Sequence, residues 1–255
     1  MSDARIIVFA HSHVGEHVLK FILEEHASDL YHTVLIDGDD KLYKMLIKMG
    51  VDSKSISWES AIYGNRFLNM FNEVDVQHLI LAWWPKIIKK PLLSAPTAGI
   101  INFHPSYLPF NRGKDPNFWT IVEENPFGVS LQLIDETIDG GDVIYQRAIN
   151  KSWTDTGETL YNKALDEILS LFKESYNEIR LGKYIRHKQP VGDGSIHFRK
   201  DLERVSEIQL EKKYTGREIL NLLRARTFQS HPACYFIEDD EKYEVRIDIK
   251  KRDIK

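Results

Sequence analysis

Residues 99–106, Gly-Ile-Ile-Asn-Phe-His-Pro-Ser, combine the pattern of a buried strand with side chains that suit a reactive site. The run 99–103 is short and mostly apolar, which predicts a strand inside a sheet. Asn102 and His104 stand two positions apart, so on a strand their side chains point to the same face. An amide and an imidazolium can donate hydrogen bonds to an oxygen that gains charge during a reaction. The alternative is that Asn102 and His104 only satisfy backbone groups where the strand ends.

Similar apolar runs lie on both sides of this stretch. They predict further strands at 5–10, 32–36, 79–83, 127–134 and 143–148. Helical spacing of apolar residues follows two early strands, at 15–23 and 41–49, and a longer stripe capped by Asp155 or Thr156 ends at Gly182. Strands that alternate with helices predict an α/β fold with a Rossmann-like open, mostly parallel sheet. In such sheets ligands bind beyond the carboxyl ends of the strands.

A carboxylate completes the candidate site. Asp139 is followed by Gly140 and Gly141, in the loop expected between the strands 127–134 and 143–148. A carboxylate can hold an imidazole in one tautomer and help it to move a proton. When an amine attacks a carbonyl carbon, the oxygen gains charge and the amine loses a proton. An amide, an imidazole and a carboxylate together are therefore suited to acyl transfer.

From residue 99 to residue 146 the chain resembles the folate-dependent formyltransferases. Their pattern N-x-H-x-S-x-L-P, a later glycine, and an Asp-x-Gly that leads through apolar residues to a glutamine is filled by Asn102, His104, Ser106, Leu108, Pro109, Gly113, Gly128, Asp139, Gly141 and Gln146. The resemblance implies that Asn102 and His104 stabilise the oxyanion, that Asp139 tunes His104, and that 10-formyltetrahydrofolate is the donor. It further implies folate contacts at Ile87, Ile88, Arg112, Gly113, Asp135 and Ile138.

The chain after residue 188 is expected to form a small α+β unit. Residues 189–195 are rich in Gly, Pro and polar residues and predict a linker, which gives a formyltransferase catalytic domain at 1–188 and a C-terminal unit at 189–255. Thr215 and Glu218 have capping-box spacing for a helix. Alternating apolar residues over 243–249 predict a strand that pairs with 233–237 across a turn at 238–242. A lone hairpin is at best marginally stable, so it should lie on the body or on a second copy. The resemblance favours a homodimer.

Composition argues against several classes of protein. The chain has 255 residues, 42% of them apolar, and a net charge of −4, which fits a mildly acidic soluble protein in which no face need be basic, so binding to nucleic acid is disfavoured. The single Cys234 cannot form an internal disulfide, and no apolar run is long enough to span a membrane. The first residues run straight into a strand pattern without a signal-peptide layout. We expect a cytoplasmic protein with no nucleic-acid or membrane partner. His11 and His13 lack a third ligand with suitable spacing, so no metal is expected.

Within the family, the segments 111–119, 195–203 and 222–228 are similar to sugar N-formyltransferases that act on dTDP-linked amino-dideoxy hexoses. This similarity implies a nucleotide-linked amino sugar as the partner, dTDP-4-amino-4,6-dideoxy-D-glucose by preference, and a place in lipopolysaccharide O-antigen biosynthesis. Substrate contacts are then expected at Ser12, His13, Lys86, Arg224 and Phe228. Phe228 is the aromatic residue of the C-terminal unit best suited to stack on thymine.

Other functions stay open. The acceptor could be a dTDP-3-amino sugar or methionyl-tRNA, although the C-terminal unit is short and mixed in charge for a tRNA enzyme. A formyltetrahydrofolate hydrolase would use water in place of the amine, and members of that group carry an additional N-terminal domain. A regulatory protein could bind a folate or nucleotide without catalysis, but it would have no need of Asn102, His104 and Asp139 together.

Overall fold

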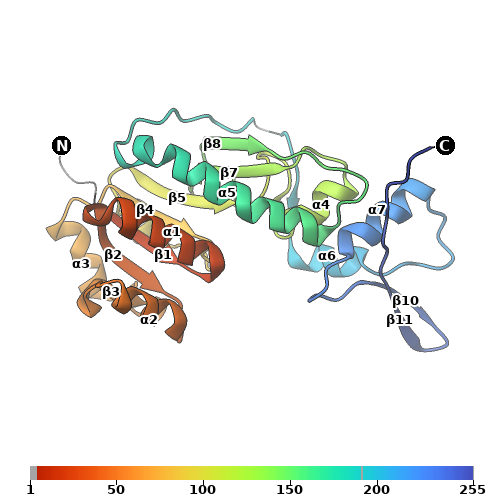
Figure 1. Ribbon diagram of the computed structural model, residues 1–255, viewed down its shortest axis with the longest axis horizontal. Helices are drawn as coiled ribbons and strands as arrows, with labels where there is room; N and C mark the ends of the chain where they lie inside the picture. The colour runs from red at the N-terminus through yellow and green to blue at the C-terminus, as the bar shows by residue number, and fades with distance from the viewer. Residues whose placement is uncertain (1–4, 191, 255) are drawn as a thin grey trace.

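The computed structural model describes residues 5–190 and 192–254, and it contains a seven-stranded sheet with helices on both faces (Figure 1). The strand order is β3-β2-β1-β4-β5-β7-β8. Strands β1 to β5 run parallel, while β7 and β8 are antiparallel at one edge. The predicted Rossmann-like, mostly parallel sheet with a small C-terminal hairpin is confirmed. No helix in the described ranges is long and apolar enough to cross a bilayer.

The elements follow one another along the chain with these bounds. They are β1 (Ile6–Ala10), α1 (Ser12–Glu25), η1 (Ala27–Asp29), β2 (Leu30–Leu35), α2 (Asp40–Lys48), η2 (Ser53–Ser55), β3 (Ile56–Trp58), η3 (Glu59–Ala61), α3 (Asn65–Glu73), β4 (His78–Ala82), η4 (Leu92–Ser94), β5 (Gly99–His104), β6 (Arg112–Gly113), α4 (Pro116–Val122), β7 (Gly128–Leu133), β8 (Val143–Ala148), α5 (Gly157–Arg180), β9 (Ile196–His197), α6 (Arg199–Val205), α7 (Gly216–Arg226), β10 (Cys234–Glu238) and β11 (Glu241–Val245).

Strand β1 is buried on both faces and therefore carries an apolar residue at every position. Successive side chains of a strand point to opposite faces. Ile6, Val8 and Ala10 belong to the core cluster that includes α1 and α5, whereas Ile7 and Phe9 belong to the cluster that includes Phe67 of α3. Because both faces are covered, the run of apolar residues at 6–10 shows no alternation.

The strand order reverses between β1 and β4, and this leaves a crevice beyond their carboxyl ends. The residues that follow these strands have left-handed backbones, with φ of 59° at Ser12 and 63° at Trp83. Such conformations are uncommon for non-glycine residues and cluster at ligand sites. A Cβ at Gly15 would lie 3.0 Å from Ala10, so glycine lets α1 begin close against the end of β1.

Several predicted boundaries differ from the structure. The helices predicted at 15–23 and 41–49 are Ser12–Glu25 and Asp40–Lys48, and α3, α4 and α6 were not predicted. The strand predicted to reach residue 249 ends at Val245, because Val245 pairs with Cys234, the first residue of β10. The hairpin turn is shorter than predicted: Asp239 and Asp240 both have positive φ, as two-residue turns require.

The helix caps agree better with the predictions. Thr156 caps α5, with Thr159 completing a capping box, and Thr215 and Glu218 form the capping box of α7. Both boxes satisfy backbone N–H groups that would otherwise lack partners at a helix start. The local sequence therefore determines where these two helices begin.

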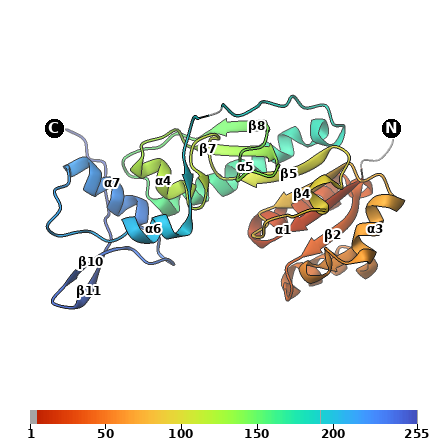
Figure 2. The ribbon, with the colours of Figure 1, turned by 180° about the vertical axis from the view of Figure 1, so that it is seen from behind.

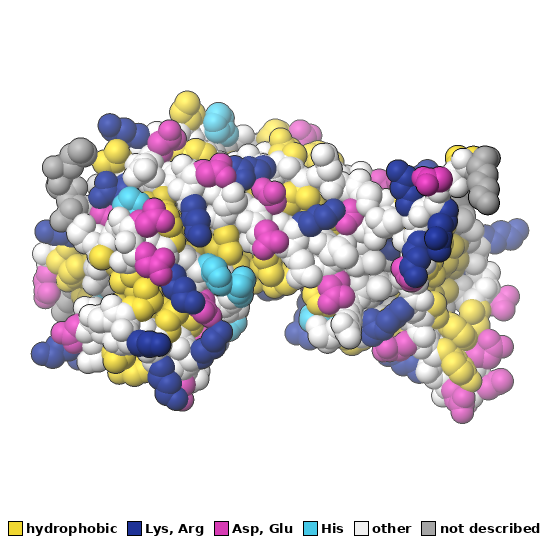
Figure 3. Space-filling model, viewed as in Figure 1, with side chains coloured by type: hydrophobic (Ala, Val, Ile, Leu, Met, Phe, Trp, Pro, Cys, Tyr) yellow, Lys and Arg dark blue, Asp and Glu magenta, His cyan; other side chains and the backbone are white. Residues whose placement is uncertain are grey.

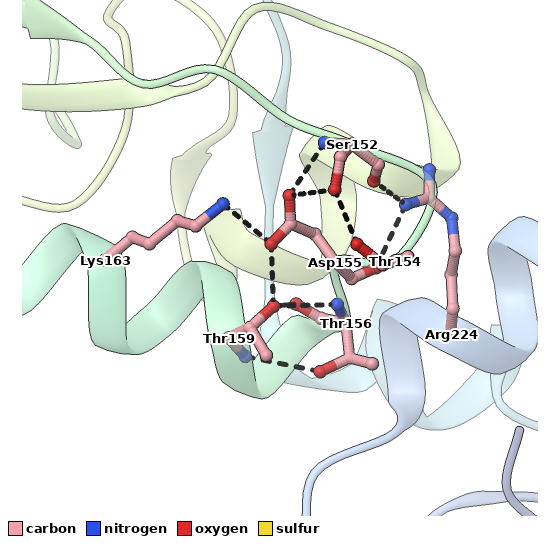
Figure 4. Close-up of polar contacts among 7 residues, drawn as sticks. All are labelled: Ser152, Thr154, Asp155, Thr156, Thr159, Lys163 and Arg224. Atoms are coloured by element: carbon pink, nitrogen blue, oxygen red, sulfur yellow. Dashed lines mark hydrogen bonds and ion pairs between the residues drawn. The ribbon is translucent and has the colours of Figure 1, made fainter. Parts of the chain in front are cut away.

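The C-terminal part docks on the sheet body through α7. Leu222 and Ala225 are buried in the same core cluster as α5, and a Cβ at Gly157 would lie 2.1 Å from the carbonyl oxygen of Ala225. Arg224 donates from Nη1 to the carbonyl oxygens of Ser152 and Asp155, at 2.9 and 3.0 Å (Figure 4). The predicted boundary between residues 188 and 189 stays a prediction.

Candidate functional site

Asn102 and His104 project from the same face of β5. In the antiparallel pairing with β7, Asn102 lies opposite Gln132 and His104 lies opposite Ser130. Directly opposed residues share one face of a sheet, so these four polar side chains form two adjacent pairs. His104 is 5% exposed, and its Nδ1 lies 3.6 Å from Oδ2 of Asp139. The structure thus brings the three predicted catalytic residues together.

Asp139 is held from several sides. Its Oδ2 accepts a hydrogen bond from the backbone N–H of Gly113 at 2.9 Å, and its Oδ1 accepts one from Nε2 of Gln132 at 2.9 Å. Gln132 is fully buried. The φ of Asp139 is +47°, a left-handed conformation that is uncommon outside glycine. The carboxylate is therefore fixed beside His104, at an ion-pair distance that is too long for a hydrogen bond.

The far side of the His104 ring, opposite Asp139, carries Nε2. Its Nε2 is buried and has no hydrogen-bond partner among the described residues. An unpaired buried polar atom costs about 1–3 kcal/mol, so most such atoms in proteins have a partner. An orphaned Nε2 next to the half-buried Asn102 is the arrangement expected where a bound ligand completes the hydrogen bonding.

Gln146 and Ser130 support the loop that follows His104. Gln146 donates from Nε2 to the carbonyl oxygen of Leu108 at 2.7 Å and to Oγ of Ser130 at 3.0 Å. Ser130 in turn donates to the carbonyl oxygen of Ser106 at 2.7 Å. These bonds give Gln146 a role in positioning the loop, which explains its place in the motif.

The residues expected to contact folate fall into two places. Ile87 is 81% exposed and Ile138 is 47% exposed, on two loops joined by an ion pair of 2.5 Å between Lys90 and Glu136. Exposed apolar side chains on adjacent loops fit a flat, largely apolar ligand. Of the remaining residues, Ile88 is buried and Asp135 accepts a hydrogen bond from Thr137. Gly113 donates to Asp139, and Arg112 donates to Gln189.

The residues expected to contact the sugar nucleotide lie in two parts of the molecule. Ser12 and His13 are exposed at the start of α1, where no acidic residue opposes the positive end of the helix dipole. Nζ of Lys86 lies 3.6 Å from Oε2 of Glu59. Figure 3 shows a notch between the sheet body and the C-terminal lobe, with histidine side chains on its left wall.

Arg224 lies in α7, and Phe228 follows just after that helix. Arg224 is buried, bound to backbone carbonyl groups, and packed over the ring of Trp153. Phe228 contacts Tyr161, and Tyr161 contacts Trp83, with ring centroids 5.6 and 5.9 Å apart. A line of aromatic rings therefore connects the end of β4 with the C-terminal part, whereas Arg224 is engaged in docking α7.

The sequence did not lead us to predict two glutamines of the site, Gln132 and Gln189. Gln132 and Ser130 are polar residues in the fully buried strand β7, and a buried polar residue in such a strand is a usable signal. Gln189 lies in the predicted linker, where nothing marked it. Within the described residues, no group of three or more His, Cys, Asp or Glu side chains is arranged to hold a metal ion.

Two family models match the chain. The model described as Formyl transferase matches residues 49–174, and the model described as N-formyltransferase dimerization C-terminal domain matches residues 201–251. A dTDP-4-amino-4,6-dideoxyglucose formyltransferase from Mycobacterium bovis is 32% identical over 139 residues. That match covers 54% of this chain and 58% of the relative, so the chain spans less than two thirds of the relative's length.

Solved structures share the fold. A 4-N formyltransferase from Francisella tularensis superposes with a TM-score of 0.80 at 22% identity, over 98% of this chain and 99% of the other. A formyltransferase from Anoxybacillus kamchatkensis, in complex with UDP-4,6-dideoxy-4-formamido-L-AltNAc and tetrahydrofolate, is 28% identical. Its TM-score is 0.58, over 79% of this chain and 89% of that one.

Proposed function

We propose that this chain, which belongs to the formyl transferase family, transfers a formyl group. The donor is 10-formyltetrahydrofolate, and the acceptor is the amino group of a nucleotide-linked amino-dideoxy sugar. The observation that carries the proposal is the buried His104, whose Nδ1 faces Asp139 while its Nε2 has no partner among the described residues. A protein that only bound folate or nucleotide would have no use for this arrangement beside Asn102.

The folate donor supplies a formyl carbon: its bond to a folate nitrogen breaks as a bond to the sugar nitrogen forms, and the proton lost by the amine passes to the folate nitrogen. Asn102 donates its amide N–H to the oxygen as charge develops there. His104 presents Nε2 to the same region and moves the proton, while Asp139 keeps the ring oriented through Nδ1. Ile87 and Ile138 provide the apolar surface for the ring system of the donor.

The relatives support a 4-amino sugar as the acceptor. The Mycobacterium bovis protein is named for dTDP-4-amino-4,6-dideoxyglucose, and the Anoxybacillus kamchatkensis structure holds a 4-formamido sugar. We therefore assign dTDP-4-amino-4,6-dideoxyglucose to this chain. Ser12, His13 and Lys86 are proposed to contact the diphosphate and sugar, and Phe228 the base. Arg224 is better assigned to the docking of α7, because its Nη1 already serves two carbonyl groups.

We assign a second copy of the chain to the C-terminal hairpin. The base of the hairpin is anchored, since Cys234 is fully buried and donates from Sγ to the carbonyl oxygen of Leu222. Its tip leaves the body: Phe236 and Tyr243 stack at 5.2 Å, and Tyr243 remains 42% exposed. The matching family model for this part is described as a dimerization domain. A symmetric partner would cover the exposed aromatic tip.

The function is tested by incubating the full chain with 10-formyltetrahydrofolate and one acceptor at a time. Tetrahydrofolate release is followed by absorbance, and the product is identified by mass spectrometry. Release that requires dTDP-4-amino-4,6-dideoxyglucose supports the proposal. Release with the 3-amino isomer or methionyl-tRNA alone would change the acceptor, and equal release without any amine would identify a hydrolase. No release with any acceptor would indicate a protein that binds folate or nucleotide without catalysis.

A further inference from the structure

The chain that follows α5 returns along the β8 side of the sheet toward α6, as Figures 1 and 2 show from opposite sides. Residues 187–190 and 192–197, here called the strap, are bound to the body at both ends. His187 and Val143 exchange two backbone hydrogen bonds of 2.9 Å. At the other end, β9 pairs with β6, and the N–H of Arg112 donates to the carbonyl oxygen of Ser195 at 2.8 Å. The predicted linker is therefore part of the site's scaffold.

Gln189 connects the strap to the Asp139 loop. Its Nε2 donates to the carbonyl oxygens of Asp139 and Gly141, both at 2.8 Å. Its Oε1 accepts from Nε of Arg112 at 3.1 Å. The same Nε2 lies 3.4 Å from Oε1 of Gln132, the residue that donates to the Asp139 carboxylate. One amide thus joins the loop, the strap and the loop after His104.

The Asp139 loop needs such a restraint. Asp139 has a left-handed backbone, and a Cβ at Gly141 would lie 1.8 Å from the carbonyl oxygen of Leu133, so the loop is held in an unusual and tight conformation. Without Gln189, Gly113 and Gln132 would still bind the carboxylate, but the backbone that carries it would be free to shift relative to Nδ1 of His104. A displacement of about 1 Å at a reacting group can cost on the order of 100-fold in rate.

We infer that Gln189 is a positioning residue, which holds the backbone of Asp139 so that its carboxylate faces His104. Its catalytic consequence rests on the formyl transfer proposed above, whereas its effect on the His104 ring can be measured without any activity. Sequence motifs of the site end at residue 146, so this role extends the site into the C-terminal third of the chain.

The test is the tautomer of His104 in the full chain, read from long-range proton–nitrogen NMR of histidine-labelled protein, with the signal assigned by His104→Gln. In wild type, the neutral ring should carry its proton on Nδ1, facing Asp139. In Gln189→Ala the proton should move toward Nε2, the form that free histidine prefers. Gln189→Glu keeps the size of the side chain but removes the Nε2 donors, so it should behave like Gln189→Ala.

Ser195→Ala is the matched control, because Ser195 belongs to the strap and bonds to Glu123 at 2.7 Å without touching Asp139. It should keep the wild-type tautomer. In the transfer assay, Gln189→Ala should lower kcat by about 10- to 100-fold with little change in the KM of the amine, as expected when orientation rather than binding is lost.

Two results would overturn the inference: a wild-type tautomer in Gln189→Ala, or the same shift in Ser195→Ala, which would mean that the strap acts only as a structural brace. If wild type transfers no formyl group, the proposed function fails, while the comparison of tautomers still decides the role of Gln189.

Discussion

Gly113 performs two tasks that only a glycine can combine. Its N–H donates to Oδ2 of Asp139, and its φ of +86° brings it so close to the strap that a Cβ would lie 2.2 Å from the carbonyl oxygen of His197. The motif glycine is therefore required by backbone geometry beside the carboxylate of Asp139. Its contact with folate, expected from the resemblance, stays a prediction.

Gly113→Ala should lower both stability and transfer rate. Gly182→Ala is its control, because Gly182 also has positive φ, +64°, but a Cβ there would meet nothing within 4 Å. Both variants bear the cost of a left-handed alanine, about 1–2 kcal/mol. Only Gly113→Ala must also displace β9, so urea denaturation should show a larger loss of unfolding free energy. Equal losses in the two variants would contradict this account of Gly113.

The residues of the site differ in how far sequence can predict them. Asn102, His104 and Asp139 stand in a dense motif, and the fold places them together as expected. Gln189 could not be predicted, because its partners are backbone carbonyl groups of residues 139 and 141, and backbone acceptors leave no mark in sequence. Arg224 was predicted from its charge, yet burial and docking of α7 account for its contacts.

Among the elements, strands β2 and β4 each carry a histidine where apolar residues would be expected. His78 in β4 is fully buried with Nε2 2.9 Å from Oη of Tyr184, and His32 in β2 lies 2.8 Å from Oγ of Ser57. Burial lowers the pKa of His78 to about 4, and the charge of Arg186 adds to the effect. Burial, with Arg66, lowers the pKa of His32 to about 4 as well.

These two histidines predict how stability depends on pH. In the unfolded chain they take up protons near pH 6.5, whereas in the folded chain they remain neutral until about pH 4. The unfolded state therefore binds more protons in this window, and the free energy of unfolding should fall as the pH drops from 6.5 to 4. Each histidine contributes up to about 1.4 kcal/mol per pH unit to the slope.

Urea denaturation over this pH range measures the slope directly. His78→Gln keeps a polar group near Tyr184 but cannot take up a proton, so it should flatten the pH dependence. His13→Gln alters an exposed side chain and should leave the slope as in wild type. A slope unchanged in His78→Gln would show that burial of His78 does not govern acid sensitivity.

Elements were predicted well where their pattern is strong and local. Apolar strands β1, β4 and β5 and the capped helix α5 follow from the sequence, because periodicity and caps lie within each segment. The end of β11 does not follow from the sequence. The alternation of apolar residues continues to residue 249, but the partner strand β10 begins at Cys234, which pairs with Val245. Strand length depends on a partner that lies elsewhere in the chain.

At the scale of the whole molecule, the hairpin projects from the C-terminal part at the end away from most of the sheet (Figures 1 and 2). A truncation after Pro232 would remove the buried residues Ala233 and Cys234, and would therefore damage the core as well as the hairpin. A substitution at the exposed tip is the cleaner test of the proposed dimer.

Tyr243→Glu should convert a dimer to a folded monomer, because it places a charge on the aromatic face proposed to meet the second copy. Lys242→Glu is its control, since the neighbouring position on the same strand points to the opposite face and should leave the dimer intact. Light scattering after gel filtration at micromolar concentration measures the molar mass of each variant and so distinguishes monomer from dimer. A wild-type monomer, or a Tyr243→Glu dimer, would contradict the proposed interface.

The most direct test of the whole account is the initial rate of tetrahydrofolate release with dTDP-4-amino-4,6-dideoxyglucose, corrected for release without the amine. Wild type should show amine-dependent release. Asn102→Ala should lower kcat at least about 100-fold, the usual cost of one lost oxyanion donor. His104→Ala should lower it by about as much because the group that moves the proton is lost, and Asp139→Asn should do comparable damage through His104. Circular dichroism establishes that each variant is folded. Near-wild-type rates in folded Asn102→Ala and His104→Ala would contradict the account.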